Sequence, residues 1–151
     1  MGAFSGFTIA TAVVMAAFAA APAAAAEFRS VAESAAVLYD APSAKAKKLY
    51  VVNLGYPVEV VVVVEGWSKV RDASGEMTWI ESRQLSEKRT VMVRMPIAQV
   101  REAADDTAPV AFQAQQNVLL ELLEVTGAGW LRVRHRDGQT GFVRVAQVWG
   151  V

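Results

Sequence analysis

Residues 66–80 read GWSKVRDASGEMTWI, and residues 129–143 read GWLRVRHRDGQTGFV. Aligned without gaps on Trp67 and Trp130, the two stretches share the preceding Gly and then a Val, an Arg, a Gly, an aromatic residue and a β-branched residue at equal spacings. Self-similarity of this kind is the signature of an internal repeat. The chain therefore contains two copies of one structural unit.

Each copy has the pattern of short β-strands. Residues 58–64 are mostly valine, and residues 67–71 and 77–80 alternate apolar and polar side chains, as half-buried strands do. Turn-forming residues separate these segments. The turns are residues 65–66 and 72–75 in the first copy, and residues 126–129 and 136–138 in the second. Short strands joined by tight turns predict an all-β chain that forms two small barrels in tandem.

Further motifs are similar to those of a known family. The first copy contains GYPVEV at 55–60, the Gly-Trp motif above and QLSEKRT at 84–90, and the second copy ends in VWGV at 148–151. Together these motifs resemble the bacterial SH3-like proteins of the cell envelope. The resemblance implies two SH3-like barrels, which we place at residues 27–90 and 91–151. It also implies recognition of peptides or cell-wall components.

The N-terminal segment predicts export. Residues 1–26 contain no charged side chain, and they end in four alanines before Glu27. Small residues at Ala24 and Ala26 fit the cleavage site of a secretory signal peptide, so we expect residues 1–26 to be a signal peptide and the rest to be periplasmic or secreted. The alternative is an uncleaved anchor, since about 20 apolar residues suffice to span a bilayer. Only in that case would the membrane be a partner.

Composition argues against several classes of function. The chain has no Cys, so disulfides, thiolate metal sites and cysteine nucleophiles are absent. His135 is the one His, which disfavours a His-rich metal site and a Ser-His-Asp triad. We therefore expect no catalytic residue, no metal, no cofactor and no enzyme activity. Fifteen acidic and fifteen basic residues balance, and this balance argues against nucleic acid as a partner.

The aromatic residues are the candidates for ligand binding. Trp67 and Trp130 follow Gly turns, and we expect both to be at least half-buried because small domains have few other large side chains to bury. A groove would form if Tyr39, Tyr56 and Trp79 met at one rim. The predicted ligand-binding residues are Tyr39, Tyr56, Trp67, Trp79, Trp130 and Phe142. Lysines at 45, 47 and 48 form either a solvated loop or a site that attracts an acidic partner.

The valine run makes a prediction about how the barrels meet. Strict alternation would turn Val62 and Val64 inward and leave Val61 and Val63 outward. Exposed apolar strips on strands invite packing, so we hypothesise that Val61 and Val63 dock the two barrels together. In the second copy the alternation breaks at Leu122-Leu123, which predicts a β-bulge.

These observations combine into one functional hypothesis. We expect a non-catalytic exported binding module that recognises cell-wall peptide or peptidoglycan in the bacterial envelope. The alternative is a structural or assembly protein that binds only an envelope protein through its barrels.

Overall fold

The computed structural model describes residues 1–2 and 25–151. The described residues form two antiparallel sheets of seven strands each, connected by turns and two short 3-10 segments. None of the helices among them is long and apolar enough to cross a membrane. The predicted signal peptide lies almost entirely outside the described residues. The all-β, two-barrel fold predicted from the repeat is confirmed.

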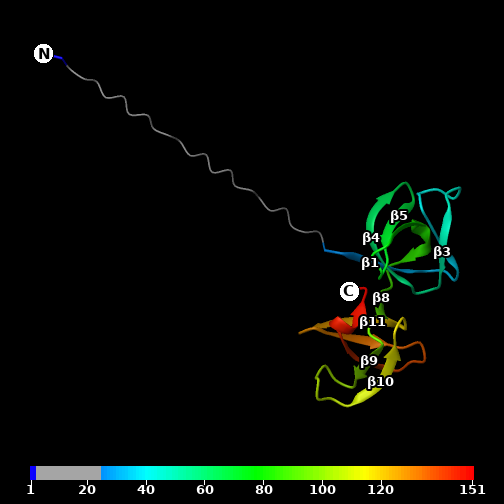
Figure 1. Ribbon diagram of the computed structural model, residues 1–151. Coiled ribbons are helices and arrows are strands. Elements are labelled where there is room, and N and C mark those ends of the chain that lie inside the picture. Colours follow the sequence, from blue (N-terminus) through cyan, green and yellow to red (C-terminus); the bar gives the residue numbers. More distant parts are fainter. Residues whose placement is uncertain (3–24) are drawn as a thin grey trace.

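The first sheet, barrel 1, has the strand order β3-β2-β6-β5-β4-β1-β7. Its elements are β1 (Glu27–Val31), β2 (Ala36–Tyr39), β3 (Lys48–Val52), β4 (Pro57–Val64), β5 (Trp67–Arg71), β6 (Met77–Glu81), the 3-10 segment η1 (Ser82–Gln84) and β7 (Leu85–Ser86). Consecutive strands from β4 to β6 pair through tight turns. Strand β1 lies beside β4 (Figure 1) and closes the barrel by also pairing with β7.

The second sheet, barrel 2, repeats this order as β10-β9-β13-β12-β11-β8-β14. Its elements are β8 (Thr90–Val93), β9 (Ile97–Arg101), β10 (Val110–Gln115), β11 (Leu119–Gly127), β12 (Trp130–Arg134), β13 (Thr140–Arg144), η2 (Val145–Gln147) and β14 (Val148–Trp149). The same topology in the same sequence order is the structural counterpart of the sequence repeat. Strand β7 ends at Ser86 and β8 begins at Thr90, so the two barrels are joined by residues 87–89. The predicted boundary after residue 90 stays a prediction.

The turn before each Trp explains why the hairpins form where they do. Glu65 and Gly66 have φ values of 46° and 85°, and positive φ at both central residues defines the tight turn that suits the twist of paired strands. In barrel 2, Ala128 and Gly129 take the same conformation, with φ values of 49° and 80°. A third positive value at Gly127, 83°, accommodates the extra residue of that turn.

Each barrel encloses its own apolar core. In barrel 1, Leu38 and Ile80 are the largest fully buried side chains, and in barrel 2 they are Leu120 and Leu131. Each pair belongs to a separate cluster of buried residues. Burial of this kind contributes roughly 1.5–3 kcal/mol per side chain, and it supplies the stability of a chain without disulfides.

The valine run departs from the predicted alternation. A β-bulge lies between Val60 and Val62, and Val62 is 44% exposed although we expected it inside. Strand β1 pairs with β4 only as far as Val60, so the far end of the β4–β5 hairpin extends beyond the barrel. The inward prediction for Val62 and Val64 is therefore wrong. The bulge predicted at Leu122-Leu123 is confirmed by a register shift between Leu122 and Glu124.

The two barrels meet through other residues than the predicted Val61 and Val63, which are both exposed. Phe28 of barrel 1 packs edge-on against Trp149 of barrel 2, with ring centroids 5.1 Å apart. Arg89 in the linker lies over the Phe28 ring and donates a 2.8 Å hydrogen bond from Nη2 to the Gly150 carbonyl. Burial lowers the pKa of the Arg89 guanidinium. The C-terminal strand therefore lies at the junction (Figure 1).

Gly150 is required by this junction. A Cβ atom there would lie 2.9 Å from the Thr90 carbonyl oxygen and 3.4 Å from Pro57 Cβ, and the residue has a φ of +114°. Residues other than glycine rarely adopt this φ. Any larger residue would force the barrels apart or distort the chain end.

Candidate binding site

An aromatic and basic row crosses the outer side of barrel 1. The strand registers pair Lys48 with Tyr39, Tyr39 with Trp79, and Trp79 with Lys69. Side chains directly opposite each other on antiparallel strands lie on the same face of the sheet. Two aromatic side chains thus lie side by side, with one lysine at each end.

Trp67 adds a second aromatic contact to this row. Its ring meets the Tyr39 ring edge-on at a centroid distance of 5.3 Å, and the Lys69 ammonium lies 5.9 Å from the centre of the Trp79 ring. Tyr39 is only 7% exposed, whereas both Trp side chains are half-buried. We call Tyr39, Trp67, Trp79, Lys48 and Lys69 the aromatic face.

Of the predicted aromatic residues in barrel 1, Tyr56 does not join the aromatic face. It packs against the core cluster of barrel 1. Burial, with a smaller contribution from Asp72, raises the pKa of its hydroxyl group. The structure thus brings Tyr39, Trp67 and Trp79 together and leaves Tyr56 in a supporting position.

The equivalent face of barrel 2 is closed. Trp130 is 4% exposed, and the Arg144 guanidinium stacks on its ring 4.3 Å from the centroid. Asp106 holds Arg144 in place by accepting a 3.1 Å hydrogen bond from Nε on Oδ1 and by a further bond from Nη2. This bond lowers the pKa of the Asp106 carboxyl and raises the pKa of Arg144. Stacked and paired guanidinium groups leave little of the indole for a ligand.

Phe142 is the barrel 2 counterpart of Trp79, and its neighbours differ too. It pairs with Arg101 on β9 and with Arg132 on β12. The second row therefore has an arginine where barrel 1 has Tyr39. Phe142 is half-buried between two cationic strand positions.

The loops beside the two faces can be compared residue by residue. In the barrel 1 loop, the Asp40 amide donates to the Lys47 carbonyl, and the Ala46 amide donates to the Ser43 carbonyl. In the barrel 2 loop, the Glu102 amide donates to the Pro109 carbonyl, and the Ala108 amide donates to the Asp105 carbonyl. Equal backbone bonds make the loops structurally equivalent. By this equivalence, Ala44 of barrel 1 stands where barrel 2 has Asp106. On the strands, Trp67 pairs with Glu81 and Trp130 pairs with Arg144, so Glu81 stands where barrel 2 has Arg144.

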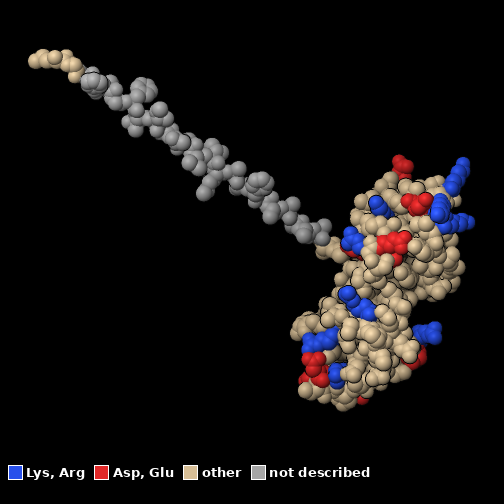
Figure 2. Space-filling view, in the orientation of Figure 1, with Lys and Arg blue, Asp and Glu red and all other residues tan. Residues whose placement is uncertain are grey.

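The charges of the two loops are opposite. Lys45 and Lys47 are exposed and lie next to Lys48 of the aromatic face, whereas the barrel 2 loop contains Glu102, Asp105 and Asp106. Figure 2 shows basic side chains gathered over the β2–β3 loop of barrel 1 and mixed charges over barrel 2. The aromatic face of barrel 1 therefore has two half-buried Trp side chains and is bordered by lysines.

Sequence reasoning missed Lys69 and Glu81. Lys69 stands two residues after Trp67 on one strand, so the two-residue period of strands could have placed it on the face. Glu81 could not be found this way. It matters because it stands where barrel 2 has Arg144, the side chain that covers Trp130. Nothing in the sequence indicated that Asp106 of the barrel 2 loop pairs with Arg144.

Two small all-β barrels in tandem define the fold class of this chain. The chain matches the model of the bacterial SH3 domain family twice, at residues 32–87 and 95–150. It belongs to this family as a tandem repeat. A comparison with curated proteins found no match.

Three solved structures are similar to this chain at low sequence identity. NlpC2 from Trichomonas vaginalis is 15% identical with a TM-score of 0.37 over 81% of this chain and 46% of that one. NlpC1 from the same organism is 16% identical with a TM-score of 0.36, over 89% and 50%. An NlpC/P60 family protein from Bacillus cereus is 19% identical with a TM-score of 0.38, over 82% and 56%. The chain spans about half the length of these proteins.

Proposed function

We propose that the protein is an exported, non-catalytic binding module of the bacterial envelope that recognises cell-wall peptide or peptidoglycan. The observation that carries this proposal is the aromatic face, where Tyr39 and Trp79 lie between Lys48 and Lys69. Aromatic rings offer flat apolar area at low entropic cost. The flanking ammonium groups attract carboxylates, which the peptides of the cell wall carry.

Barrel 1 is the binding copy in this proposal. Trp67 and Trp79 are both half-buried, so a ligand can cover the part of each ring that still contacts water. In barrel 2 the corresponding Trp130 is covered by Arg144. The proposal therefore assigns wall binding to Trp67, Trp79 and Lys69, and a supporting role to the second barrel.

The test is co-sedimentation of the protein with purified peptidoglycan. Trp79→Ala removes a half-buried ring of the aromatic face, and Phe142→Ala is the matched control because it truncates the equivalent, also half-buried, ring of barrel 2. We expect the wild type and Phe142→Ala to sediment and Trp79→Ala to stay in solution with an unchanged circular dichroism spectrum. Equal sedimentation of both variants would contradict the choice of face, and no sedimentation of the wild type would contradict wall binding.

A second candidate is an assembly protein that binds only an envelope protein. It is favoured by the exposed valines 61–64 at the end of the β4–β5 hairpin, because β4 has β5 as its one strand partner over these residues in the described part of the chain. An open apolar strand edge can pair with a strand of another protein. For this candidate, Val63→Lys should abolish binding of the partner protein. A Val63→Lys variant that still bound its protein partners would count against it.

A further inference from the structure

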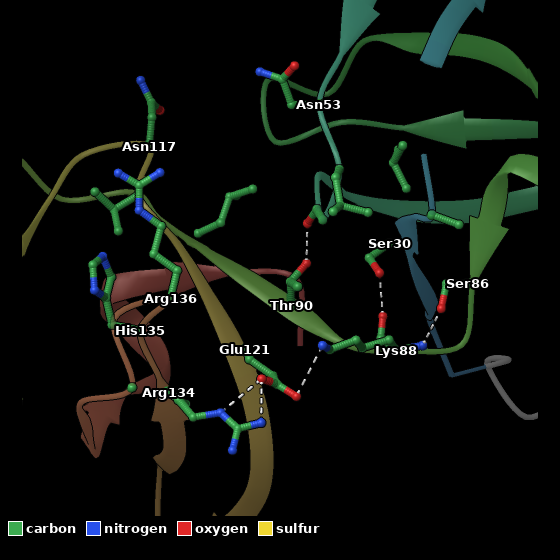
Figure 3. A pocket seen from close by; sticks show the side chains of 17 residues that line it. Ser30, Asn53, Ser86, Lys88, Thr90, Asn117, Glu121, Arg134, His135 and Arg136 are labelled. Carbon is green, nitrogen blue, oxygen red and sulfur yellow. Dashed lines mark hydrogen bonds and ion pairs between the residues drawn. The ribbon is translucent and has the colours of Figure 1, made fainter. Parts of the chain in front are cut away.

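A groove lies between the two barrels, separate from the aromatic face. It has a volume of about 1140 Å³. Its walls are the β3–β4 turn of barrel 1, the linker between β7 and β8, and the β10–β11 and β12–β13 turns of barrel 2 (Figure 3). Because both barrels supply walls, a single repeat could not form this groove.

The walls of the groove are fixed by bonds that cross the junction. Thr90 Oγ1 donates a 2.5 Å hydrogen bond to the Gly55 carbonyl, and Ser30 Oγ donates one of 2.5 Å to the Lys88 carbonyl (Figure 3). The Phe28 and Trp149 contact described above holds the same junction from outside the groove. A preformed groove binds its ligand without a large cost for ordering its own walls.

The groove carries an excess of positive charge. Lys88, Arg134 and Arg136 line it, together with a single carboxylate, Glu121. Glu121 pairs with Arg134 at 2.7 Å and with Lys88 at 3.5 Å, and the hydrogen bond from Arg134 is the main cause of its lowered pKa. Among the groove residues drawn in Figure 3, Arg136 has no ion pair. The guanidinium of Arg136 is therefore available to an acidic ligand. The groove is more positive than the chain as a whole, whose net charge is zero.

The remaining lining groups suit a peptide. Asn117 stands next to Arg136, and Asn53 faces the groove from barrel 1 (Figure 3). Carboxamide side chains can donate to and accept from a peptide bond at once. Leu54 is 58% exposed at the same turn as Asn53, so an apolar side chain of a ligand can pack there.

We propose that this inter-barrel groove is a second binding site, which takes a short acidic peptide. The peptide carboxylate pairs with Arg136, its backbone bonds to Asn53 and Asn117, and an apolar side chain packs on Leu54. The site needs both barrels in their docked arrangement, which gives the duplication a purpose beyond adding a second face. It does not depend on wall binding by the aromatic face.

The test is a titration of the full-length ¹⁵N-labelled protein, followed by NMR. The probe is the peptide acetyl-Leu-Ala-Glu, and the control peptide is acetyl-Leu-Ala-Gln amide, which has no carboxylate. We expect saturable shifts of the backbone amides of Asn53, Asn117 and Arg136 with the acidic peptide and much smaller shifts with the neutral one. One charge-assisted pair is worth roughly a tenfold change in affinity, so Arg136→Ala should weaken binding by about that factor.

Matched variants separate this site from the aromatic face. Arg132→Ala removes an exposed arginine of the neighbouring strand β12, outside the groove, and should leave the affinity unchanged. Leu54→Ser should weaken binding without loss of folding, because Leu54 is exposed. Shifts confined to Trp67, Trp79 and Lys69 would overturn the groove while supporting the aromatic face. Unchanged affinity of Arg136→Ala, or equal binding of the neutral peptide, would also overturn it.

Discussion

Barrel 1 and barrel 2 share one fold and present opposite outer faces. Their strand orders and loop hydrogen bonds are equal. Yet Trp67 is half-buried, near lysines, whereas Trp130 is buried under Arg144, which Asp106 holds. Two positions account for much of the difference, since Ala44 and Glu81 stand where Asp106 and Arg144 stand. The core therefore determines the barrel fold, and a few surface positions determine whether its outer face can bind a ligand.

The largest difference should appear when the two equivalent tryptophans are removed. Trp130→Ala takes away a ring that is 4% exposed and should lower the free energy of unfolding by about 3 kcal/mol. Trp67→Ala removes a half-buried ring and should cost below about 2 kcal/mol, while reducing wall binding. Urea denaturation of both variants measures this, and equal losses of stability would show that the faces are not distinct.

The next prediction transfers the closed face to barrel 1. The double variant Ala44→Asp/Glu81→Arg places a carboxylate and a guanidinium where barrel 2 has them, so the new arginine should stack on Trp67. A stacked cation blocks the ring, and we expect peptidoglycan binding to fall by roughly tenfold, equivalent to about 1.4 kcal/mol.

The control for this transfer is Glu81→Arg alone, which lacks the carboxylate that orients the arginine. It should have an intermediate effect. If the double variant bound the wall as the wild type does, access to Trp67 would not determine binding.

The fold was largely predictable and the faces were not. Repeat spacing, alternation and turn residues around Trp67 and Trp130 predicted both barrels, because these features are local in sequence. The end of β4 was mispredicted because its exposure depends on where β1 stops, at the pairing of Glu27 with Val60. A pattern along one strand contains no information on the length of its neighbour.

The same reasoning applies to the site. Trp67 could be identified from its position after a Gly turn, and Tyr39 and Trp79 as further aromatic residues of the same repeat. Whether each is open depends on a side chain from another strand and loop, as with Arg144 and Asp106, which are 38 residues apart. The docking of the barrels was mispredicted for this reason as well, since Phe28 belongs to the first strand, β1, and Trp149 to the last strand, β14.

A smaller effect should come from the loop lysines. Lys45, Lys47 and Lys48 are exposed, so their attraction for a carboxylate is screened by salt. Raising NaCl from about 0.1 M to about 1 M shortens the screening length from about 10 Å to about 3 Å. Binding should weaken by roughly threefold if the pairs have the energies usual for exposed charges. The triple variant with serine at these positions keeps Lys69, so it should lose most of this salt dependence and serves as the control.

The smallest predicted effect is the response of barrel 2 to acid. The hydrogen bond from Arg144 lowers the pKa of Asp106 in the folded protein, so the folded state binds a proton at this carboxyl less readily than the unfolded chain does. The stabilisation from the pair is therefore complete above the ordinary Asp pKa of about 4, and it is lost as the pH falls through the lowered value. Arg144 should then leave Trp130, and iodide should quench Trp130 fluorescence more strongly in acid. Asp106→Asn should show the stronger quenching already at neutral pH and should lose the acid-dependent change. A pH profile of Trp130 quenching identical in the two proteins would mean that Asp106 does not hold the face closed, and that the difference between the barrels lies in Arg144 alone.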